Sequence, residues 1–315
     1  MKLLLSLMVL CLASTNVMAS WPERNVTVVL PFPAGNGSDM IGRILADELS
    51  KKFNVNFVVE NKPGATTTLG TNHVINSTPD GYTILFTSVS TIAAKFVLRN
   101  TKHDIEKDLF PITSITESPM ALIVSPKKFK TIQEFIKAGK ERELLFGSVG
   151  YGSSTHFVGA KFMDFAKLKY RTIPYKGTQQ IYNDLVTGEI DFTFTPIQGA
   201  KSLYDGGQLN FLGIVSDKRL SVISSIPTFK ELGYKNFDFY FWTGVYVPKD
   251  VSLEIANKIL IALNQIKNSD SFKNKLGNLG IIPTDDLTFK QFIKFIRKQQ
   301  NEYSKMVKDL SIEIK

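Results

Sequence analysis

Two turns rich in glycine and hydroxyl side chains carry the clearest chemical signal in the sequence. The first, residues 31–39, follows the apolar run 26–30, and the second, residues 147–156, follows the run 144–146. A helical pattern begins directly after each turn, so each turn is predicted to place unpaired backbone N–H groups at a helix N-terminus. Such groups bind anions, because the helix dipole adds partial positive charge there. Two turns that face each other would clamp a small anion in a cleft.

Three side chains of the first turn have expected roles. Ser38 or Asp39 is placed to cap the following helix, since its side-chain oxygen would accept a hydrogen bond from a first-turn N–H group. For Asp39, the sequence leaves open whether the carboxylate only caps the helix or also contacts a ligand. Phe32 is expected to form an apolar wall of the cleft.

The second turn offers Ser153 and Ser154 as hydroxyl donors for a carboxylate. His156 lies in the first helical turn, where a cap or core position is as compatible with the sequence as a ligand contact. The same residues raise an alternative, a secreted hydrolase with Ser153 or Ser154 as nucleophile and His156 as base. A nucleophile and a base two or three residues apart at a helix start do not readily pair, and no third partner is evident. We therefore expect a binding protein that is not an enzyme.

Other kinds of site are disfavoured by residue spacing. The first turn lacks the last glycine of a dinucleotide-binding G-x-G-x-x-G motif, because Met40 occupies that position, and it has no Gly-Lys-Ser/Thr sequence. The sequence around Ser148 misses the G-x-S-x-G pattern of hydrolases by one position. The three histidines, at positions 73, 103 and 156, show no metal-ligand spacing. Neither a metal nor a cofactor is expected.

The first 19 residues have the features of a secretory signal peptide. A basic start precedes the apolar stretch 3–12, and small residues before Ser20 indicate cleavage after Ala19. Leu10 precedes Cys11 where a lipoprotein signal would have a small residue, so a lipid anchor is not expected. Cys11 is the single cysteine of the chain, and its removal excludes disulfides, cysteine–zinc sites and thiol catalysis. The expected location is the bacterial periplasm.

The formal net charge of +9 raises the question of nucleic-acid binding. The lysines are scattered singly along the chain, and no basic run with interleaved aromatic residues occurs. A mildly basic surface that attracts anionic solutes explains the charge, and no nucleic-acid partner is expected.

The elements that position the two turns alternate between strand and helix. Strands are predicted at residues 26–30, 57–60, 83–87, 121–124, 144–146, 172–173, 192–195, 211–215 and 242–247. Helices are predicted at residues 38–52, 67–77, 131–140, 154–166 and 177–187. Helix starts are also indicated by capping boxes at Thr131, Thr228 and Thr288, and the chain is predicted to be wholly helical from Ser252. This alternation predicts an α/β fold of mainly parallel sheets flanked by helices.

Seven short motifs occur together and in order along the chain. They are Pro31-Phe-Pro-Ala-Gly with Asp39, Glu60-Asn-Lys-Pro-Gly-Ala65, Pro79-Asp-Gly-Tyr-Thr83, Gly150-x-Gly-Ser-Ser-x-His156, Pro174-Tyr-Lys-Gly177, Gly188-Glu-Ile-Asp191 and Ile226-Pro-Thr228. In this combination the chain resembles the extracytoplasmic solute receptors of tripartite tricarboxylate transporters, the Bug or TctC family. The resemblance covers essentially the whole chain after the leader.

The resemblance implies a two-domain periplasmic-binding-protein fold, type II-like, that closes like a Venus flytrap over an organic acid. The expected division is residues 20–122 for the first part of domain 1, 123–242 for domain 2, and 243–315 for the return to domain 1. It also implies delivery of a small organic carboxylate to the integral membrane subunits of a transporter, with the receptor as a monomer. A receptor that instead reports to a sensor of a two-component system remains an alternative, and the identity of the carboxylate stays open.

The resemblance also implies site residues. The first jaw would contain Phe32, Ala34, Gly35, Asn36, Ser38 and Asp39, and the second Gly150, Gly152, Ser153, Ser154 and His156. Ser88 and Ser90 would form another edge of the pocket. Tyr175, Thr195 and Trp242 lie where the family varies its side-chain contacts, although core packing is an equal alternative, and a stronger one for Trp242.

The chain departs from the family pattern at three places. Asn36 replaces a usual glycine, so this position is expected to accept left-handed backbone geometry, which asparagine tolerates. Thr66 and Thr67 replace a Gly-Gly pair, which should stiffen or reshape that turn. Phe194-Thr195-Pro196 lacks the acid and amide usual near the pocket, which disfavours an amino-acid ligand and favours plain carboxylates.

Overall fold

The computed structural model describes residues 21–99, 101, 104–239, 241–310 and 312. The predicted leader, with Cys11 and the cleavage site after Ala19, lies outside these residues. Within the described part of the chain, no helix is both long enough and apolar enough to cross a membrane.

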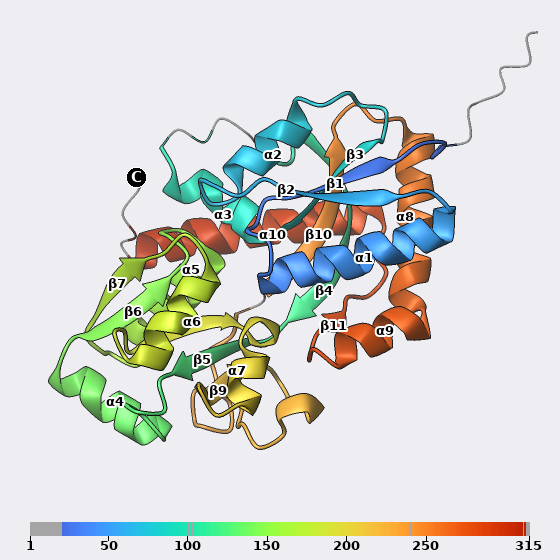
Figure 1. Ribbon diagram of the computed structural model, residues 1–315. Coiled ribbons are helices and arrows are strands. Elements are labelled where there is room, and N and C mark those ends of the chain that lie inside the picture. The colour runs from blue at the N-terminus through green and yellow to red at the C-terminus, as the bar shows by residue number, and fades with distance from the viewer. Residues whose placement is uncertain (1–20, 100, 102–103, 240, 311, 313–315) are drawn as a thin grey trace, which may run out of the picture.

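The first domain is built on a six-stranded sheet with the strand order β11-β4-β10-β3-β1-β2 (Figure 1). Its strands are β1 (Val26–Leu30), β2 (Phe57–Asn61), β3 (Thr83–Ser88), β4 (Leu109–Ser118), β10 (Phe241–Pro248) and β11 (Ile282–Pro283). Three helices, α1 (Gly37–Phe53), α8 (Leu253–Asn268) and α9 (Asp270–Gly277), share an apolar core with one face. The opposite face packs against α2 (Thr68–Ile75), α3 (Ser90–Val97) and α10 (Phe289–Asp309).

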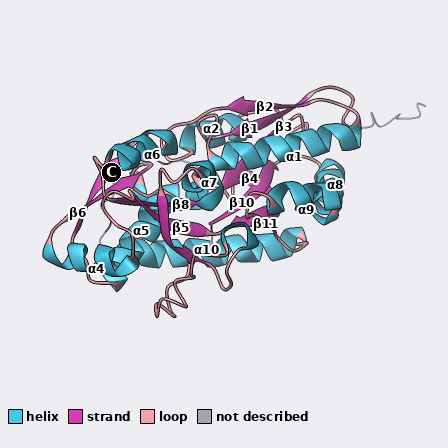
Figure 2. Cartoon of the chain, turned by 60° about the horizontal axis from the view of Figure 1, so that its bottom comes forward, coloured by secondary structure: helices cyan, strands magenta, loops and turns pink. Residues whose placement is uncertain are grey.

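The second domain is built on a five-stranded sheet with the strand order β7-β6-β8-β5-β9. Its strands are β5 (Met120–Val124), β6 (Leu144–Ser148), β7 (Tyr170–Pro174), β8 (Phe192–Pro196) and β9 (Asn210–Val215). Helices α4 (Ile132–Glu141) and α5 (Ser154–Phe165) cover one face, and α6 (Thr178–Thr187) and α7 (Lys201–Asp205) cover the other. Figure 2 shows this layering of helices on both sides of the strands.

The predicted two-domain α/β fold is confirmed, but the sheets are mixed. Among the named strands, β1 pairs in parallel with β2 and β3, and β6 pairs in parallel with β7 and β8. Strand β10 runs antiparallel to β3 and β4, and β5 runs antiparallel to β8 and β9. The expectation of mainly parallel sheets is therefore wrong, because strands at the domain crossings enter each sheet from the other domain and run in the opposite direction.

Other expectations fail locally. Strand β4 and helix α3 were not predicted, and β11 interrupts the segment after Ser252 that was expected to be wholly helical. At Thr228 the reciprocal capping bonds with Glu231 form, yet they close a turn and no helix follows. At Thr288 the predicted capping box does begin a helix, α10.

The chain passes between the domains from β4 to β5 and again between β9 and β10. Helix α10 runs across both domains behind these crossings (Figure 1). Near its C-terminal end, Tyr303 packs edge-on against Phe157 of α5, with ring centroids 4.7 Å apart. Apolar side chains of the two sheets and of α10 thereby form one continuous buried cluster, which holds the rear of the domains together.

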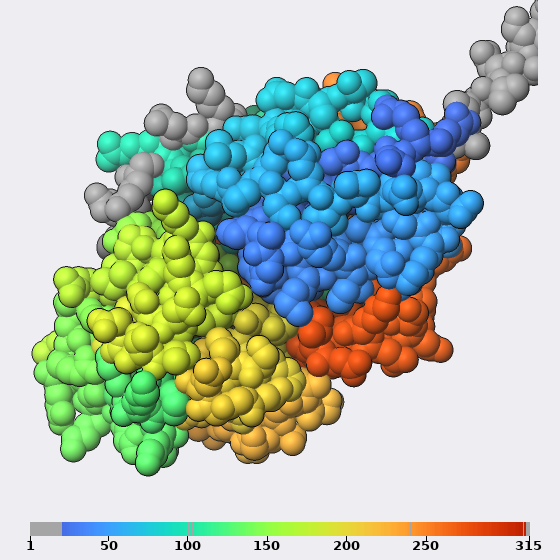
Figure 3. All heavy atoms as spheres, viewed as in Figure 1, coloured from blue at the N-terminus to red at the C-terminus, as the bar shows by residue number. Residues whose placement is uncertain are grey.

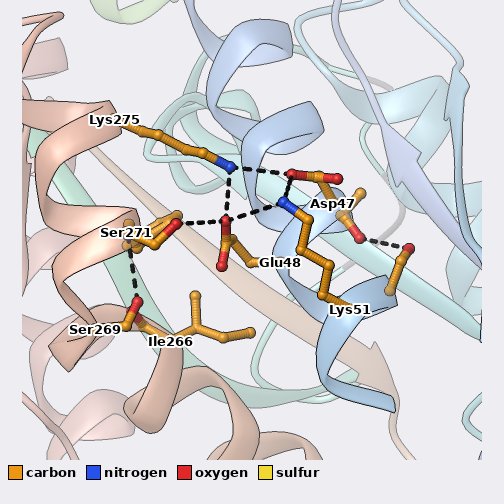
Figure 4. Close-up of polar contacts among 10 residues, drawn as sticks. Asp47, Glu48, Lys51, Ile266, Ser269, Ser271 and Lys275 are labelled. Atoms are coloured by element: carbon orange, nitrogen blue, oxygen red, sulfur yellow. Dashed lines mark hydrogen bonds and ion pairs between the residues drawn. The ribbon is translucent and has the colours of Figure 1, made fainter. Parts of the chain in front are cut away.

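A network of charged side chains fastens α1 to α9 at the edge of the first domain (Figure 4). Lys275 Nζ lies 2.7 Å from a carboxylate oxygen of Glu48 and 3.0 Å from one of Asp47, and Lys51 completes the network. Hydrogen bonds to these two carboxylates raise the pKa of Lys275, so the lysine stays charged. The network fixes the C-terminal part of α1, whose other end leads to the first turn.

The motif that ends at Asp191 has a structural role in the second domain. Gly188 ends α6 with a left-handed φ of 92°, and the chain then buries Asp191 to 1% exposure. Both carboxylate oxygens accept bonds of 2.8 Å from Arg142, and Lys128 and the Leu145 amide donate two more. Burial alone would raise the pKa of Asp191, but these hydrogen bonds outweigh burial and lower it.

We expect Asp191→Asn to lower the free energy of unfolding by about 3 kcal/mol at neutral pH, the usual cost of breaking a buried ion pair. Because the pKa is lowered in the folded state, this stabilisation is complete above the unfolded pKa of about 3.9 and is lost as the pH falls through the folded value. Urea unfolding should therefore show a smaller difference in free energy of unfolding between the parent protein and Asp191→Asn at about pH 3 than at pH 7. Asp217→Asn, which removes an exposed carboxylate paired with Lys230, should cost under about 1 kcal/mol. If Asp191→Asn and Asp217→Asn lowered the free energy of unfolding equally, the buried ion pairs of Asp191 would not stabilise the domain as expected.

Candidate functional site

A cavity of about 650 Å³ lies between the two domains. Five helices begin at its wall, each directly after a strand of the parallel part of a sheet. Helices α1, α2 and α3 belong to the first domain, and α5 and α6 to the second. The first-turn N–H groups of a helix have no partner within that helix, and the helix dipole adds positive charge at the same end. The sequence had indicated two such termini, and the structure brings together five.

The first turn is held in shape by Asp39, which is 2% exposed. Its carboxylate accepts hydrogen bonds from the Gly35 amide at 2.9 Å, from Arg43 at 2.9 Å and from Asn61 at 2.8 Å. Asn61 also donates to the carbonyl of Phe32, so it links the turn to β2. Burial tends to raise the pKa of Asp39, but these hydrogen bonds lower it overall. Asp39 therefore supports the turn from behind, and it does not line the cavity.

The helix cap of the first turn differs from the expectation. Asn36, not Ser38 or Asp39, is the N-cap of α1, and its side-chain oxygen accepts from the Asp39 N–H group at 2.8 Å. Asn36 has a φ of −79°, so the expected left-handed geometry at this position is also wrong. Gly35, with a φ of +80°, makes the reversal instead, and this leaves Asn36 extended as a cap requires.

The second turn is built on a cluster of hydroxyl groups. Ser153 is the N-cap of α5, and its hydroxyl accepts from the His156 N–H group and donates to the Gly150 carbonyl at 2.7 Å. The hydroxyls of Ser148 and Thr155 lie 3.2 and 2.8 Å from that of Ser153. These bonds shape the turn, while Ser153 and Thr155 also face the cavity.

The geometry gives no support to a serine–histidine pair. Ser153 uses its hydroxyl within the turn, and the hydroxyl of Ser154 lies 3.3 Å from that of Ser90 in the other domain. His156 Nδ1 accepts from the Gly152 N–H group at 3.3 Å, so this ring nitrogen is engaged with the backbone. The ring stacks on Phe146 and is 5% exposed. His156 thus occupies the core position that the sequence had left open, and it does not line the cavity.

The domains touch directly around the cavity (Figure 3). Ser90, at the start of α3, accepts a hydrogen bond from the Ser154 N–H group of α5 at 3.3 Å. The hydroxyl of Thr66 lies 3.5 Å from the carbonyl of Tyr151, and Gln179 lies at the same distance from the carbonyl of Gly35. These long bonds cross from one domain to the other, so they form only when the cleft is closed.

The turn before α2 is strained. Ala65, Thr66 and Thr67 have φ values of 44°, 47° and 74°, a left-handed geometry that β-branched residues avoid. The hydroxyl of Thr67 lies 2.8 Å from that of Thr91, which in turn lies 2.6 Å from that of Thr87. This hydroxyl chain ties the N-cap of α2 to α3 and β3 and holds the strained turn in the cavity wall. Whether Thr66 and Thr67 stiffen or reshape the turn stays a prediction.

The structure brings many of the predicted site residues to one cavity. Those that line it are Phe32, Asn36, Ser38, Ser88, Ser90, Gly150, Ser153, Ser154 and Tyr175. Those that do not are Ala34, Gly35, Asp39, Gly152, His156 and Thr195. Thr195 lies one layer behind, where its hydroxyl is 2.9 Å from that of Tyr182. Trp242 is 1% exposed, and its indole N–H group donates to Gln299. It therefore packs in the core, the alternative that the sequence had favoured for this residue.

Several lining residues were not predicted. They are Pro31, Pro33, Gly37, Pro63, Gly64, Ala65, Thr66, Thr67, Val149, Thr155, Lys176, Gly177, Thr178, Tyr182, Pro196, Gly199 and Phe241. Most belong to motifs that the sequence displays, such as the Pro-Gly turn before α2 and the Tyr-Lys-Gly turn before α6. The rule that ligands bind at the carboxyl ends of parallel strands would have indicated these turns. Tyr182 and Phe241 reach the cavity from within a helix and a strand, and no local signal marks them.

None of the described residues that line the cavity is an aspartate or a glutamate. Burial raises the pKa of Tyr182 to about 12, so its phenol is neutral. Among the described residues, no group of three or more histidine, cysteine, aspartate or glutamate side chains could hold a metal. The site therefore offers N–H and O–H hydrogen-bond donors to an anion, in a partly apolar cavity.

Gly152, in the second turn, lies close to Val97 of the first domain. A Cβ atom there would lie 2.0 Å from Cγ2 of Val97 in α3, whereas one at Gly150 would meet nothing within 4 Å. Both glycines have positive φ, so alanine strains the backbone at either position. Gly152→Ala should force the cleft open and increase the radius of gyration measured by small-angle X-ray scattering.

Gly150→Ala is the matched control, and it should leave the radius of gyration unchanged. Val97→Ala combined with Gly152→Ala should restore part of the compactness. A Gly152→Ala protein as compact as the parent would show that this contact does not limit closure.

Comparison with known proteins agrees with this architecture. A family model described as tripartite tricarboxylate transporter family receptor matches residues 41–312. BugT of Bordetella pertussis (strain Tohama I) is 29% identical over 251 residues, which are 78% of this chain and 76% of that protein. The periplasmic binding protein BugD has a TM-score of 0.85 at 26% identity over 93% of this chain and 99% of its own. Rpa4515 of R. palustris, solved with adipate, has a TM-score of 0.89 at 26% identity and the same coverage.

The resemblance seen in the seven motifs is thus confirmed over nearly the whole described chain. The chain belongs to the TctC family of tripartite tricarboxylate transporter receptors, which are periplasmic solute-binding proteins.

Proposed function

We propose that this protein captures a small organic carboxylate between its two domains and delivers it to the membrane subunits of a tripartite transporter. The observation that carries the proposal is the convergence of five helix N-termini on one cavity without an acidic side chain. This arrangement favours an anion and offers no partner for an ammonium group. The relative solved with adipate supports a carboxylate in particular.

The mechanism rests on binding that differs between two states. A carboxylate that accepts hydrogen bonds from both domains gains its full set of bonds only when the cleft is closed, so binding shifts the population toward closure. In the closed form, Ser90 and Ser154 bond across the cleft. Closure excludes water from the donors, which strengthens each hydrogen bond to the anion. The closed form then presents a single surface, formed by both domains, to the transporter.

A thermal-shift panel tests the proposal, with mono-, di- and tricarboxylates, amino acids and aromatic acids as ligands. A ligand at about 100 times its Kd adds about 2.7 kcal/mol to the free energy of unfolding. For a chain of this size the melting temperature should rise by several degrees, at about 2–4 °C per kcal/mol. We expect at least one carboxylate to produce such a shift and amino acids to produce none.

The Ser154→Ala variant should reduce the shift, because Ser154 lines the cavity at the start of α5. Ser252→Ala removes a similar hydroxyl at the N-terminus of α8, far from the cavity, and should leave the shift intact. If no carboxylate raises the melting temperature of the parent protein, the proposed ligand class is wrong. If both variants lose the shift equally, the cavity is not the binding site.

A further inference from the structure

Charge is scarce in the cavity wall. Among the described residues that line it, Lys176, in the turn between β7 and α6, is the one that carries a charge. Its side chain is exposed at the mouth, and it forms no hydrogen bond or ion pair with any described residue. Two neighbouring cations are occupied elsewhere, since Arg43 binds Asp39 and Lys62 binds Glu60. Lys176 is therefore a cation with no counterion in a wall built for an anion.

A large part of the remaining wall cannot donate hydrogen bonds. The cavity is lined by four prolines, which carry no backbone N–H group, and by the aromatic rings of Phe32 and Phe241. The prolines are Pro31, Pro33, Pro63 and Pro196. A hydroxyl or a carboxylate held against these surfaces would lose its hydrogen bonds to water without replacement. The wall therefore suits a ligand whose polar groups are few and whose middle is apolar.

This inference rests on the receptor function proposed above and narrows its ligand. We propose that the ligand is a dicarboxylate with an apolar spacer, and that Lys176 is the residue that selects for the second carboxylate. The first carboxylate accepts hydrogen bonds from the Ser154 hydroxyl, which only accepts in its contact with Ser90, and from backbone N–H groups at the neighbouring helix N-termini. The spacer lies against the prolines and the aromatic rings, and the second carboxylate pairs with Lys176 at the mouth.

The same lining residues disfavour other classes of acid as ligands. A tricarboxylate would place a third charge against apolar wall, because the described lining residues include one lysine and no arginine or histidine. An amino acid would bury its ammonium group with no carboxylate to pair with. A monocarboxylate would leave Lys176 without an anionic partner, so Lys176 would add nothing to its affinity.

The test compares affinities by isothermal titration calorimetry for matched pairs of acids. The dicarboxylates succinate, adipate and suberate are each set against the monocarboxylate of the same chain length, namely butyrate, hexanoate and octanoate. In the parent protein, at least one dicarboxylate should bind about tenfold more tightly than its monocarboxylate, as expected for one added charge-assisted hydrogen bond. Lys176→Met, which keeps the length of the side chain, should remove this preference and leave monocarboxylate binding within about twofold.

Two further variants test whether the preference depends on the positive charge at position 176 and not on side-chain shape or on lysines elsewhere. Lys176→Arg keeps the charge and should keep the preference. Lys273→Met removes an exposed lysine of α9, remote from the cavity, and should change neither affinity. Because Lys176 is exposed, its replacement should leave the far-UV circular dichroism and the melting temperature of the unliganded protein unchanged.

The outcomes distinguish this inference from the function on which it rests. Equal affinities for dicarboxylates and monocarboxylates in the parent protein would overturn the role of Lys176 and leave a carboxylate receptor intact. A dicarboxylate preference that survives in Lys176→Met would overturn it as well. If no carboxylate of the series or of the wider thermal-shift panel binds, the proposed function fails together with this inference.

Discussion

The convergence of helix N-termini on one cavity is the constraint around which this molecule is arranged. In a parallel strand–helix unit, the helix starts at the carboxyl edge of its strand, so several adjacent units present their N-termini at one edge. Each domain contributes such an edge, and the two edges face each other across the cavity. The positive potential of the site therefore comes from the fold itself, and the side chains around it need only preserve it. No described lining residue is acidic, and Arg43 binds the carboxylate of Asp39; both features preserve that potential.

The antiparallel strands of the two sheets serve a different purpose. Strands β4, β5 and β10 adjoin the crossings between the domains and run against their neighbours, so their ends do not contribute helix N-termini to the cavity. Behind the crossings, Tyr303 of α10 contacts Phe157 of α5 within a continuous apolar cluster. Around the cavity, the domains meet through single long hydrogen bonds and through the packing of Gly152 against Val97. The strong contacts lie at the rear and the weak ones at the front, which is the distribution that a hinged cleft requires.

Much of this organisation could be predicted from the sequence, since strand–helix alternation and glycine-rich turns are local signals. Helix α3 was missed because its sequence, rich in alanine and β-branched residues, has no polar face and lacks a capping side chain. Strand β4 was missed because Pro111 and several hydroxyl residues interrupt its apolar pattern. In the site, the sequence identified the turns but not the direction of each side chain. The side chains of Asp39 and His156 belong to those turns but do not line the cavity, because Asn61 binds Asp39 and Phe146 packs against His156.

A receptor that must release its ligand gains from this use of neutral donors. A buried ion pair in the closed cleft would require the desolvation of a side-chain charge at every cycle of opening and closing, at a cost of several kcal/mol. Backbone N–H groups are already oriented by their helices, so they bind an anion with little reorganisation. The one lysine of the wall stands at the mouth, where water still reaches it and where a pair is weaker and more easily broken. Under the proposed mode of binding, the fold separates holding an anion, by helix N-termini in the enclosed part, from discriminating among anions, by Lys176 at the solvent boundary.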